Sequence, residues 1–278
     1  MEKKMFIDRK DATRVRNLTG LNQIMLDLKP NRCDSDVFIN QKLDVTNIVK
    51  YMEKLKKKDS DITYFHIFVA AIAKMLYLRP QLNYFVANRH VYSHDEIVIS
   101  FVAKVAFDDK AEEIMVLIPV SEDDTLFTIS ETIKTKIDLI RNKKASKEGA
   151  NDAIDLLGKL PNIIRVPLVG SLKWCDKKGL LPASLMKDNI YYSSIIVSNL
   201  GSIDCGAIYH NITNFGTASS LATIGKIEVE GKKSYCEFGI NLDERIADGY
   251  YMVKSLHLLQ QLFEKPEQLE GKIKDEIK

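Results

Sequence analysis

A charged segment near the C-terminus reads Leu242-Asp243-Glu244-Arg245-Ile246-Ala247-Asp248-Gly249-Tyr250. It follows an alternating run, residues 234–242, in which every second residue is apolar, as in a half-buried strand. It precedes residues that repeat apolar side chains at helical spacing from Gly249 onward. By residue types alone, the segment is a loop in which Asp248 lies near a helix N-terminus, where the helix dipole stabilises a carboxylate by about 0.3–1 kcal/mol.

Working outward, the remaining pattern mixes helices and strands. We expect helices at 44–58 and from Thr63 to the residue before Pro80, and a third helix behind a capping box formed by Thr128 and Glu131. Strands are expected at 97–107, 114–120, 191–197 and 221–229, the first two forming a hairpin across 108–113. This order predicts an α/β fold, a two-layer sandwich with a mixed β-sheet.

Length and composition limit the number of domains and the classes of partner. The 278 residues are 45% hydrophobic and 28% charged, so the chain can bury a sizeable core. Without internal repeats, and with only 143–151 resembling a linker, residues 1–278 are expected to form a single domain. Forty basic against 38 acidic residues give a net charge of +2, too balanced for a nucleic-acid or anionic-membrane partner held by bulk charge.

The absence of certain sequence features sets our expectations for the cellular compartment and for metal binding. The N-terminus has no apolar core of a leader and no run of about 18 apolar residues occurs, so a cytoplasmic chain without a transmembrane segment is expected. The four cysteines are scattered without a CxxC pair, and no metal site is predicted. Nucleotide-binding loops, HExxH and GxSxG are absent, which disfavours dinucleotide, zinc-protease and serine-hydrolase chemistry.

Four stretches in a characteristic order carry a family resemblance. Asp243 to Gly249 resembles the DHRxxDG signature of dihydrolipoamide acyltransferases from 2-oxo acid dehydrogenase complexes, to which chloramphenicol acetyltransferase, with HHxxxDG, is related. The other stretches are Arg79-Pro80-Gln81-Leu82-Asn83, Val197-Ser198-Asn199-Leu200-Gly201 and Ala222-Thr223-Ile224-Gly225-Lys226-Ile227-Glu228. The resemblance covers roughly Phe6 to Phe263 and implies the CoA-dependent acyltransferase (chloramphenicol acetyltransferase-like) fold.

The resemblance also implies residue roles. A histidine at the second signature position would act as general base, but Glu244 stands there, and an unperturbed glutamate is about two pKa units more acidic than a histidine. Burial in an apolar channel could restore a useful base. Ser198 matches the serine that hydrogen-bonds the oxyanion. Asp248 matches the signature aspartate that pairs with an arginine, here Arg14 or Arg16.

His210 is a second candidate for the general base, besides Glu244. His210 lies in the segment 205–217, where the relatives place a loop near the active-site channel, and Tyr209 beside it could position a ligand; the alternative is an ordinary surface histidine. Cys205 is interpreted as an ordinary thiol. His66, on a buried helix, is interpreted as a core histidine with its polar atoms satisfied.

The implied cofactor is coenzyme A, as an acyl-CoA substrate. No lipoyl or subunit-binding domain is recognised in this chain, so a lipoyl group would be supplied in trans, and the acceptor is otherwise an unidentified small molecule. The relatives are trimers with active sites at subunit boundaries, which implies a homotrimer in which Glu244 and Ser198 come from different subunits.

The apolar segment 156–186, interrupted by Pro161, Pro167 and Pro182, has two interpretations. It lines the core or a subunit interface, or it forms an apolar pocket or lid around the isolated Trp174 that accommodates a hydrophobic acyl group.

Two functions remain open from the sequence. The first is a CoA-dependent acyltransferase that uses Ser198 and either Glu244 or a substitute base. The second is a catalytically inactive family member that keeps the fold and acts as a binding or regulatory subunit.

Overall fold

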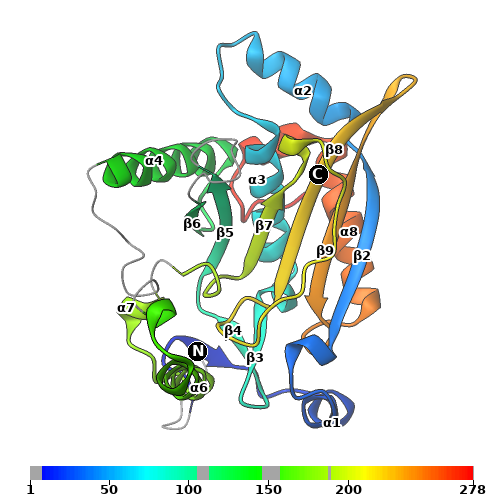
Figure 1. Cartoon of the computed structure of the whole chain (residues 1–278). Coiled ribbons are helices and arrows are strands. Elements are labelled where there is room, and N and C mark those ends of the chain that lie inside the picture. The colour runs from blue at the N-terminus through cyan, green and yellow to red at the C-terminus, as the bar shows by residue number, and fades with distance from the viewer. Residues whose placement is uncertain (1–7, 105–112, 146–156, 187–188, 278) are drawn as a thin grey trace.

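The large sheet of the molecule has six strands in the order β2-β9-β8-β7-β5-β6 (Figure 1). The structure is a computed structural model and describes residues 8–104, 113–145, 157–186 and 189–277. The strands span Asp36–Asp44 (β2), Lys233–Asp243 (β9), Ser220–Glu230 (β8), Ile195–Asn199 (β7), Ile97–Lys104 (β5) and Glu113–Val120 (β6). Strand β7 runs parallel to β5 and β8, and the other pairs are antiparallel, so the sheet is mixed as predicted.

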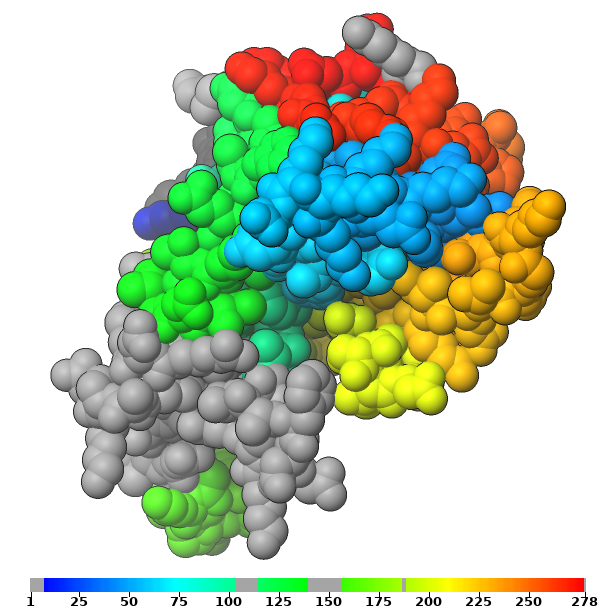
Figure 2. All heavy atoms as spheres, turned by 90° about the horizontal axis from the view of Figure 1, so that it is seen from above, coloured from blue at the N-terminus to red at the C-terminus, as the bar shows by residue number. Residues whose placement is uncertain are grey.

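Helices cover one face of this sheet. They are α2 (Thr46–Lys56), α3 (Tyr64–Leu78), α4 (Leu126–Ala145) and α8 (Gly249–Glu264). Figure 2, seen from above, shows α2 and the C-terminal residues on one side and the residues that follow β7 on the other. Alternate strand residues such as Val197, Ala222 and Ile240 pack into the main core under the helices. The two-layer α/β sandwich is therefore confirmed.

The other elements lie at one end of the large sheet or link its parts. A small sheet combines β1 (Ala12–Arg14), β4 (His90–His94) and β3 (Tyr84–Ala87), and near it are α1 (Gly20–Leu28), α6 (Asn162–Lys177) and α7 (Ala183–Met186) (Figure 1). Short 3-10 helices occupy Arg32–Asp34, Pro80–Asn83, Gly201–Ile203 and Pro266–Glu270. Of the helices described, none is both long and apolar enough to cross a membrane.

Helix α3 is the centre of the core, as its sequence predicts. Thr63 caps its N-terminus by accepting a hydrogen bond from the amide of His66, and the helix ends before Pro80. Its residues from Ile67 to Leu76 are all buried. His66 is itself buried, and its Nδ1 lies 2.8 Å from the Ser130 hydroxyl and 3.3 Å from the Thr63 amide, which confirms the interpretation as a satisfied core histidine.

Two of the expected boundaries are wrong. Helix α4 begins at Leu126, and the reciprocal cap joins Thr125 and Thr128, each amide donating to the other hydroxyl, so Glu131 lies inside the helix. Strand β7 begins at Ile195. Before it, the Ser194 hydroxyl accepts a hydrogen bond from the Val98 amide and the Ser193 hydroxyl lies 2.8 Å from the Ser100 hydroxyl, both in β5. Strand β5 is described from Ile97 to Lys104, and its expected end at residue 107 lies outside the described residues, as does the connection to β6. The predicted hairpin with β6 is confirmed by its register.

The interpretation of the apolar segment as core is wrong for α6. Ile163 is 84% exposed and Trp174 is 58% exposed. Within the described part of this segment, Asp176 and Leu181 are the buried residues.

We expect acid to destabilise this fold through His66. Burial lowers the pKa of His66 to about 4, below its ordinary value of 6.5, so the unfolded chain binds a proton that the folded chain excludes. The free energy of unfolding should fall as the pH decreases from about 6.5 towards 4. Urea titrations of wild type and His66→Gln across this range test this.

Burial lowers the pKa of His94 to about 4 as well, so His94→Gln is the parallel variant. Each single variant should show a shallower dependence on pH than wild type. An unchanged slope in both variants would contradict the assignment.

Candidate functional site

A buried ion pair organises the loop between β9 and α8. Arg245 donates from Nε to Asp243 Oδ1 at 2.8 Å and from Nη2 to Asp243 Oδ2 at 2.6 Å. The Ser35 hydroxyl donates to the same carboxylate at 2.9 Å, and Arg32 Nε lies 3.9 Å from it. Asp243 is fully buried, so this cluster of charges lies in the interior and holds residues 244–248, the signature loop, in place.

The same loop is tied to the chain that precedes β2. Arg245 Nη1 donates to the Lys29 carbonyl at 2.8 Å, and the Glu244 amide donates to the Ser35 carbonyl at 2.8 Å. The backbone of Glu244 is thereby held on both sides. Its side chain points to the surface, where it is 41% exposed and accepts a hydrogen bond from Lys29 Nζ at 2.5 Å.

Asp248 is the N-cap of α8. Its carboxylate accepts a hydrogen bond from the Tyr251 amide at 2.7 Å, which is the local role that the residue types predict. The two arginines considered as its partners lie beside Asp8 instead, with Arg14 Nη1 at 3.5 Å and Arg16 bonded to the same carboxylate. The structure therefore does not bring Asp248 together with either arginine.

Ser198 lies in β7, on the face of the sheet that the helices leave free. It pairs with Thr223 of β8, which in turn pairs with Gly239 of β9. Glu244 lies five residues beyond Gly239, and a strand advances about 3.3 Å per residue, so Glu244 and Ser198 of one protomer are separated by about 15 Å or more. The two predicted catalytic groups cannot act together within one chain.

A loop over residues 205–217 covers part of this free face. The Thr223 hydroxyl donates to the Ile208 carbonyl at 3.4 Å, and the His210 amide donates to Asn241 Oδ1 at 3.1 Å. The Tyr209 hydroxyl lies 3.5 Å from the Asp36 carboxylate, whose pKa is raised chiefly by burial. His210 therefore lies over β9, which is separated from β7 by β8.

The His210 imidazole is partly buried, and its buried Nε2 has no hydrogen-bond partner among the residues that the structure describes. Burial lowers the pKa of His210 below its ordinary value, which keeps the imidazole neutral at pH 7. A neutral ring with an unengaged nitrogen is the form that a general base requires.

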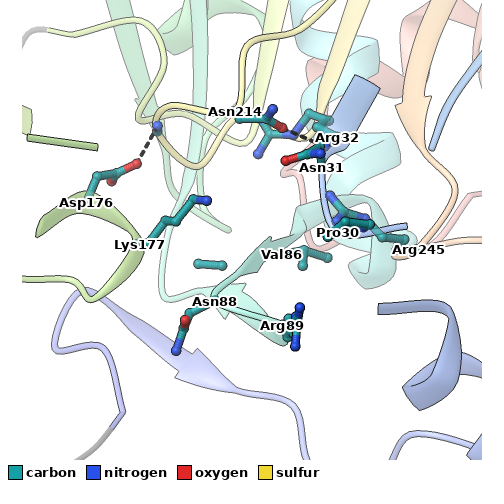
Figure 3. Close-up of a pocket in the computed structure, with 12 residues that line it drawn as sticks. Pro30, Asn31, Arg32, Val86, Asn88, Arg89, Asp176, Lys177, Asn214 and Arg245 are labelled. Carbon is teal, nitrogen blue, oxygen red and sulfur yellow. Dashed lines mark hydrogen bonds between the residues drawn. The ribbon is translucent and has the colours of Figure 1, made fainter. Parts of the chain in front are cut away.

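A small polar pocket of about 170 Å³ lies beside the signature loop (Figure 3). Its lining comes from residues 30–32, 86–89 and 176–177 together with Asn214, Gly216 and Arg245. Asp176 accepts a hydrogen bond from the Gly216 amide, and Asn214 accepts one from the Arg32 amide. Sequence reasoning missed this pocket because its residues come from distant segments that carry no common motif.

No cluster suited to a metal ion is found in the described residues. There, no three His, Cys, Asp or Glu side chains are grouped as potential ligands.

We expect Asp243→Asn to destabilise the protein strongly. Removing one partner leaves the buried Arg245 guanidinium uncompensated, which typically costs about 3–5 kcal/mol. Chemical denaturation measures the change. Glu230→Gln is the matched control, because it removes an exposed ion pair with Lys42 and should leave the midpoint unchanged. Equal midpoints for the two variants would contradict the central role of the Asp243–Arg245 pair.

Comparison with known proteins identifies the fold. No family model and no curated protein matches the sequence. Among solved structures, the truncated catalytic core of the 2-oxoacid dehydrogenase multienzyme complex from Thermoplasma acidophilum is 17% identical, with a TM-score of 0.58 over 91% of this chain and 98% of that one. A probable dihydrolipoamide acetyltransferase from Listeria monocytogenes is 16% identical, with a TM-score of 0.54 over 95% and 98%.

Chloramphenicol acetyltransferase is also similar, at 12% identity and a TM-score of 0.60 over 91% of this chain and 99% of that chain. Nearly complete coverage on both sides means that the whole architecture is shared. The fold that the four sequence stretches predicted is therefore confirmed: this chain has a chloramphenicol acetyltransferase-like fold.

Proposed function

We propose that this chain is a CoA-dependent acyltransferase that moves an acyl group between coenzyme A and an acceptor with a thiol, hydroxyl or amine. The observation that carries the proposal is the placement of Ser198 and His210 on the free face of the sheet, in a chain with an acyltransferase fold. The acceptor is a small molecule or a lipoyl group supplied in trans. Residues 1–278 act as one domain in this proposal.

The reaction uses these groups in a simple sequence. A base takes the proton of the acceptor, and the acceptor atom forms a bond to the thioester carbonyl carbon. The Ser198 hydroxyl donates a hydrogen bond to the oxyanion that develops there. The intermediate then collapses, the carbon–sulfur bond to CoA breaks, and the CoA sulfur takes up the proton from the base.

Two groups are candidates for the base. Glu244 occupies the position implied by the family resemblance, but its carboxylate is paired with Lys29 at the surface of the protomer. It would need burial by another subunit to become an effective base. His210 is neutral and has an unengaged buried nitrogen in the protomer as it stands.

A homotrimer accommodates both predicted roles. Because Ser198 and Glu244 of one protomer are far apart, a site containing both would have to form between subunits. Asp248 would contribute by holding the start of α8 and hence the end of the signature loop.

One observation favours the second function, a catalytically inactive binding or regulatory subunit. The hydrogen bond from Lys29 engages the Glu244 carboxylate, and an engaged surface carboxylate is a poor proton acceptor. In that case the chain would keep the fold and the ligand channel without the chemistry.

We expect coenzyme A and short acyl-CoA thioesters to bind the purified protein with micromolar dissociation constants. Isothermal titration calorimetry measures this without knowledge of the acceptor. Dephospho-CoA and free pantetheine, used as partial ligands, show which part of CoA contributes. Absence of binding across the series would overturn the acyltransferase proposal.

Variants of the two candidate bases assign the proton transfer. Loss of the general base lowers the rate by about 10²–10⁴. We expect one of Glu244→Gln and His210→Gln to lose thiol-dependent acyl transfer to this extent, with CoA affinity retained in both. Lys29→Gln, which frees Glu244, should raise activity if Glu244 is the base and leave it unchanged if His210 is.

Size-exclusion chromatography with light scattering shows whether each variant keeps the assembly of wild type. Activity that appears only in Glu244→His would favour the inactive-subunit alternative. Full activity in both glutamine variants would exclude both residues as the base.

A further inference from the structure

Helix α6 exposes more apolar surface than a solvated helix needs. Ile163, Val166 and Trp174 are 84%, 64% and 58% exposed and follow one another on one side of the helix. On the other sides of the helix, Ile164, Leu168 and Val169 are 52%, 38% and 41% exposed. Clustered exposure of this kind marks an interaction surface.

The charges around this surface have one sign. Residues 157–178 contain five basic residues, Lys159, Arg165, Lys173, Lys177 and Lys178, and a single acidic residue, Asp176. Asp176 is buried, lies 3.8 Å from Arg9 and accepts hydrogen bonds from Tyr192 and Gly216. The surface charge of this segment is therefore positive, although the whole chain is nearly neutral.

The position of α6 leaves the apolar stripe accessible. Figure 1 shows the helix at the edge of the molecule beside α7, away from the helices that cover the large sheet. Its anchored end is the C-terminal turn, where Asp176 joins α6 to Arg9 and Tyr192. The most exposed residue, Ile163, lies at the opposite end.

We propose that α6 docks this protein onto the surface of an anionic phospholipid membrane, lying in the plane of the headgroups. The apolar stripe enters the interface, and the basic residues contact the headgroups. This combination of exposed aliphatic residues, a tryptophan and lysines is what an interfacial helix requires. Sixteen residues span about 24 Å, too short to cross a bilayer core of about 30 Å, so the helix lies on the membrane.

Charge argues against the same stripe pairing with its copy in a second chain. A symmetric α6–α6 contact would bring basic side chains of both copies together without an exposed acid in the segment to neutralise them. An anionic headgroup layer supplies the complementary charge.

Trp174 is the single tryptophan of the chain, so tryptophan fluorescence reports on α6 alone. Full-length protein is mixed with vesicles of phosphatidylcholine alone or with about 30% phosphatidylserine, then sedimented. We expect sedimentation and a blue shift of Trp174 emission with the anionic vesicles and neither effect with the neutral ones. Because exposed charges are screened by salt, raising NaCl from 0.1 to 0.5 M should weaken binding at least tenfold.

Matched variants separate the apolar and the charged contributions. Ile163→Asp should abolish vesicle binding, whereas Val229→Asp, at a residue 74% exposed in β8, should leave it unchanged. Lys173→Gln should weaken binding about fivefold, and Lys232→Gln in the β8–β9 turn should not. Circular dichroism shows that all four variants retain the fold.

Two outcomes would overturn the proposal. The first is wild-type protein that stays in the supernatant with both kinds of vesicle. The second is Trp174 emission that is already blue-shifted without vesicles, together with a lower oligomeric mass in Ile163→Asp, which would identify the stripe as a contact between subunits.

Discussion

The buried pair of Asp243 and Arg245 is the constraint around which the rest of this molecule is arranged. It joins the end of β9 to the loop before α8, and through Ser35 and the Lys29 carbonyl it holds the chain that enters β2. A buried charged pair is stable only when nearly every polar atom has a partner. That requirement determines the path of both segments and so the position of the Glu244 backbone.

The sequence predicts those parts of the fold in which local and tertiary preferences agree. Helix α3 is apolar on nearly all sides, capped by Thr63 and ended by Pro80, and residues 234–242 of β9 alternate in sequence. Strand β2 escaped prediction because it lies at the edge of the sheet and contains Asn40, Gln41 and Lys42, whose side chains suit solvent. Helix α6 escaped prediction because Pro167 lies inside it and its apolar residues have no core to face.

The candidate site is predictable only in its residue types. Motif order leads to Ser198 and Glu244, but not to the separation between them, which depends on the register of three strands. The burial that lowers the pKa of His210 arises because the loop over residues 205–217 folds onto β9, far along the chain. The pocket beside Arg245 draws on segments from Pro30 to Gly216, so no local pattern could reveal it.

The pairing of β2 with β9 has a consequence for synthesis of the chain on the ribosome. Asp36 pairs with Asp243 and Asp44 with Tyr235. Strand β2 is therefore synthesised early but can pair only after β9, near the end of the chain, has been synthesised. Contacts this distant in sequence form slowly, and a waiting strand is exposed to other chains. The polar residues Asn40, Gln41 and Lys42 make that strand a poor template for aggregation while nascent chains stand close together on a polysome.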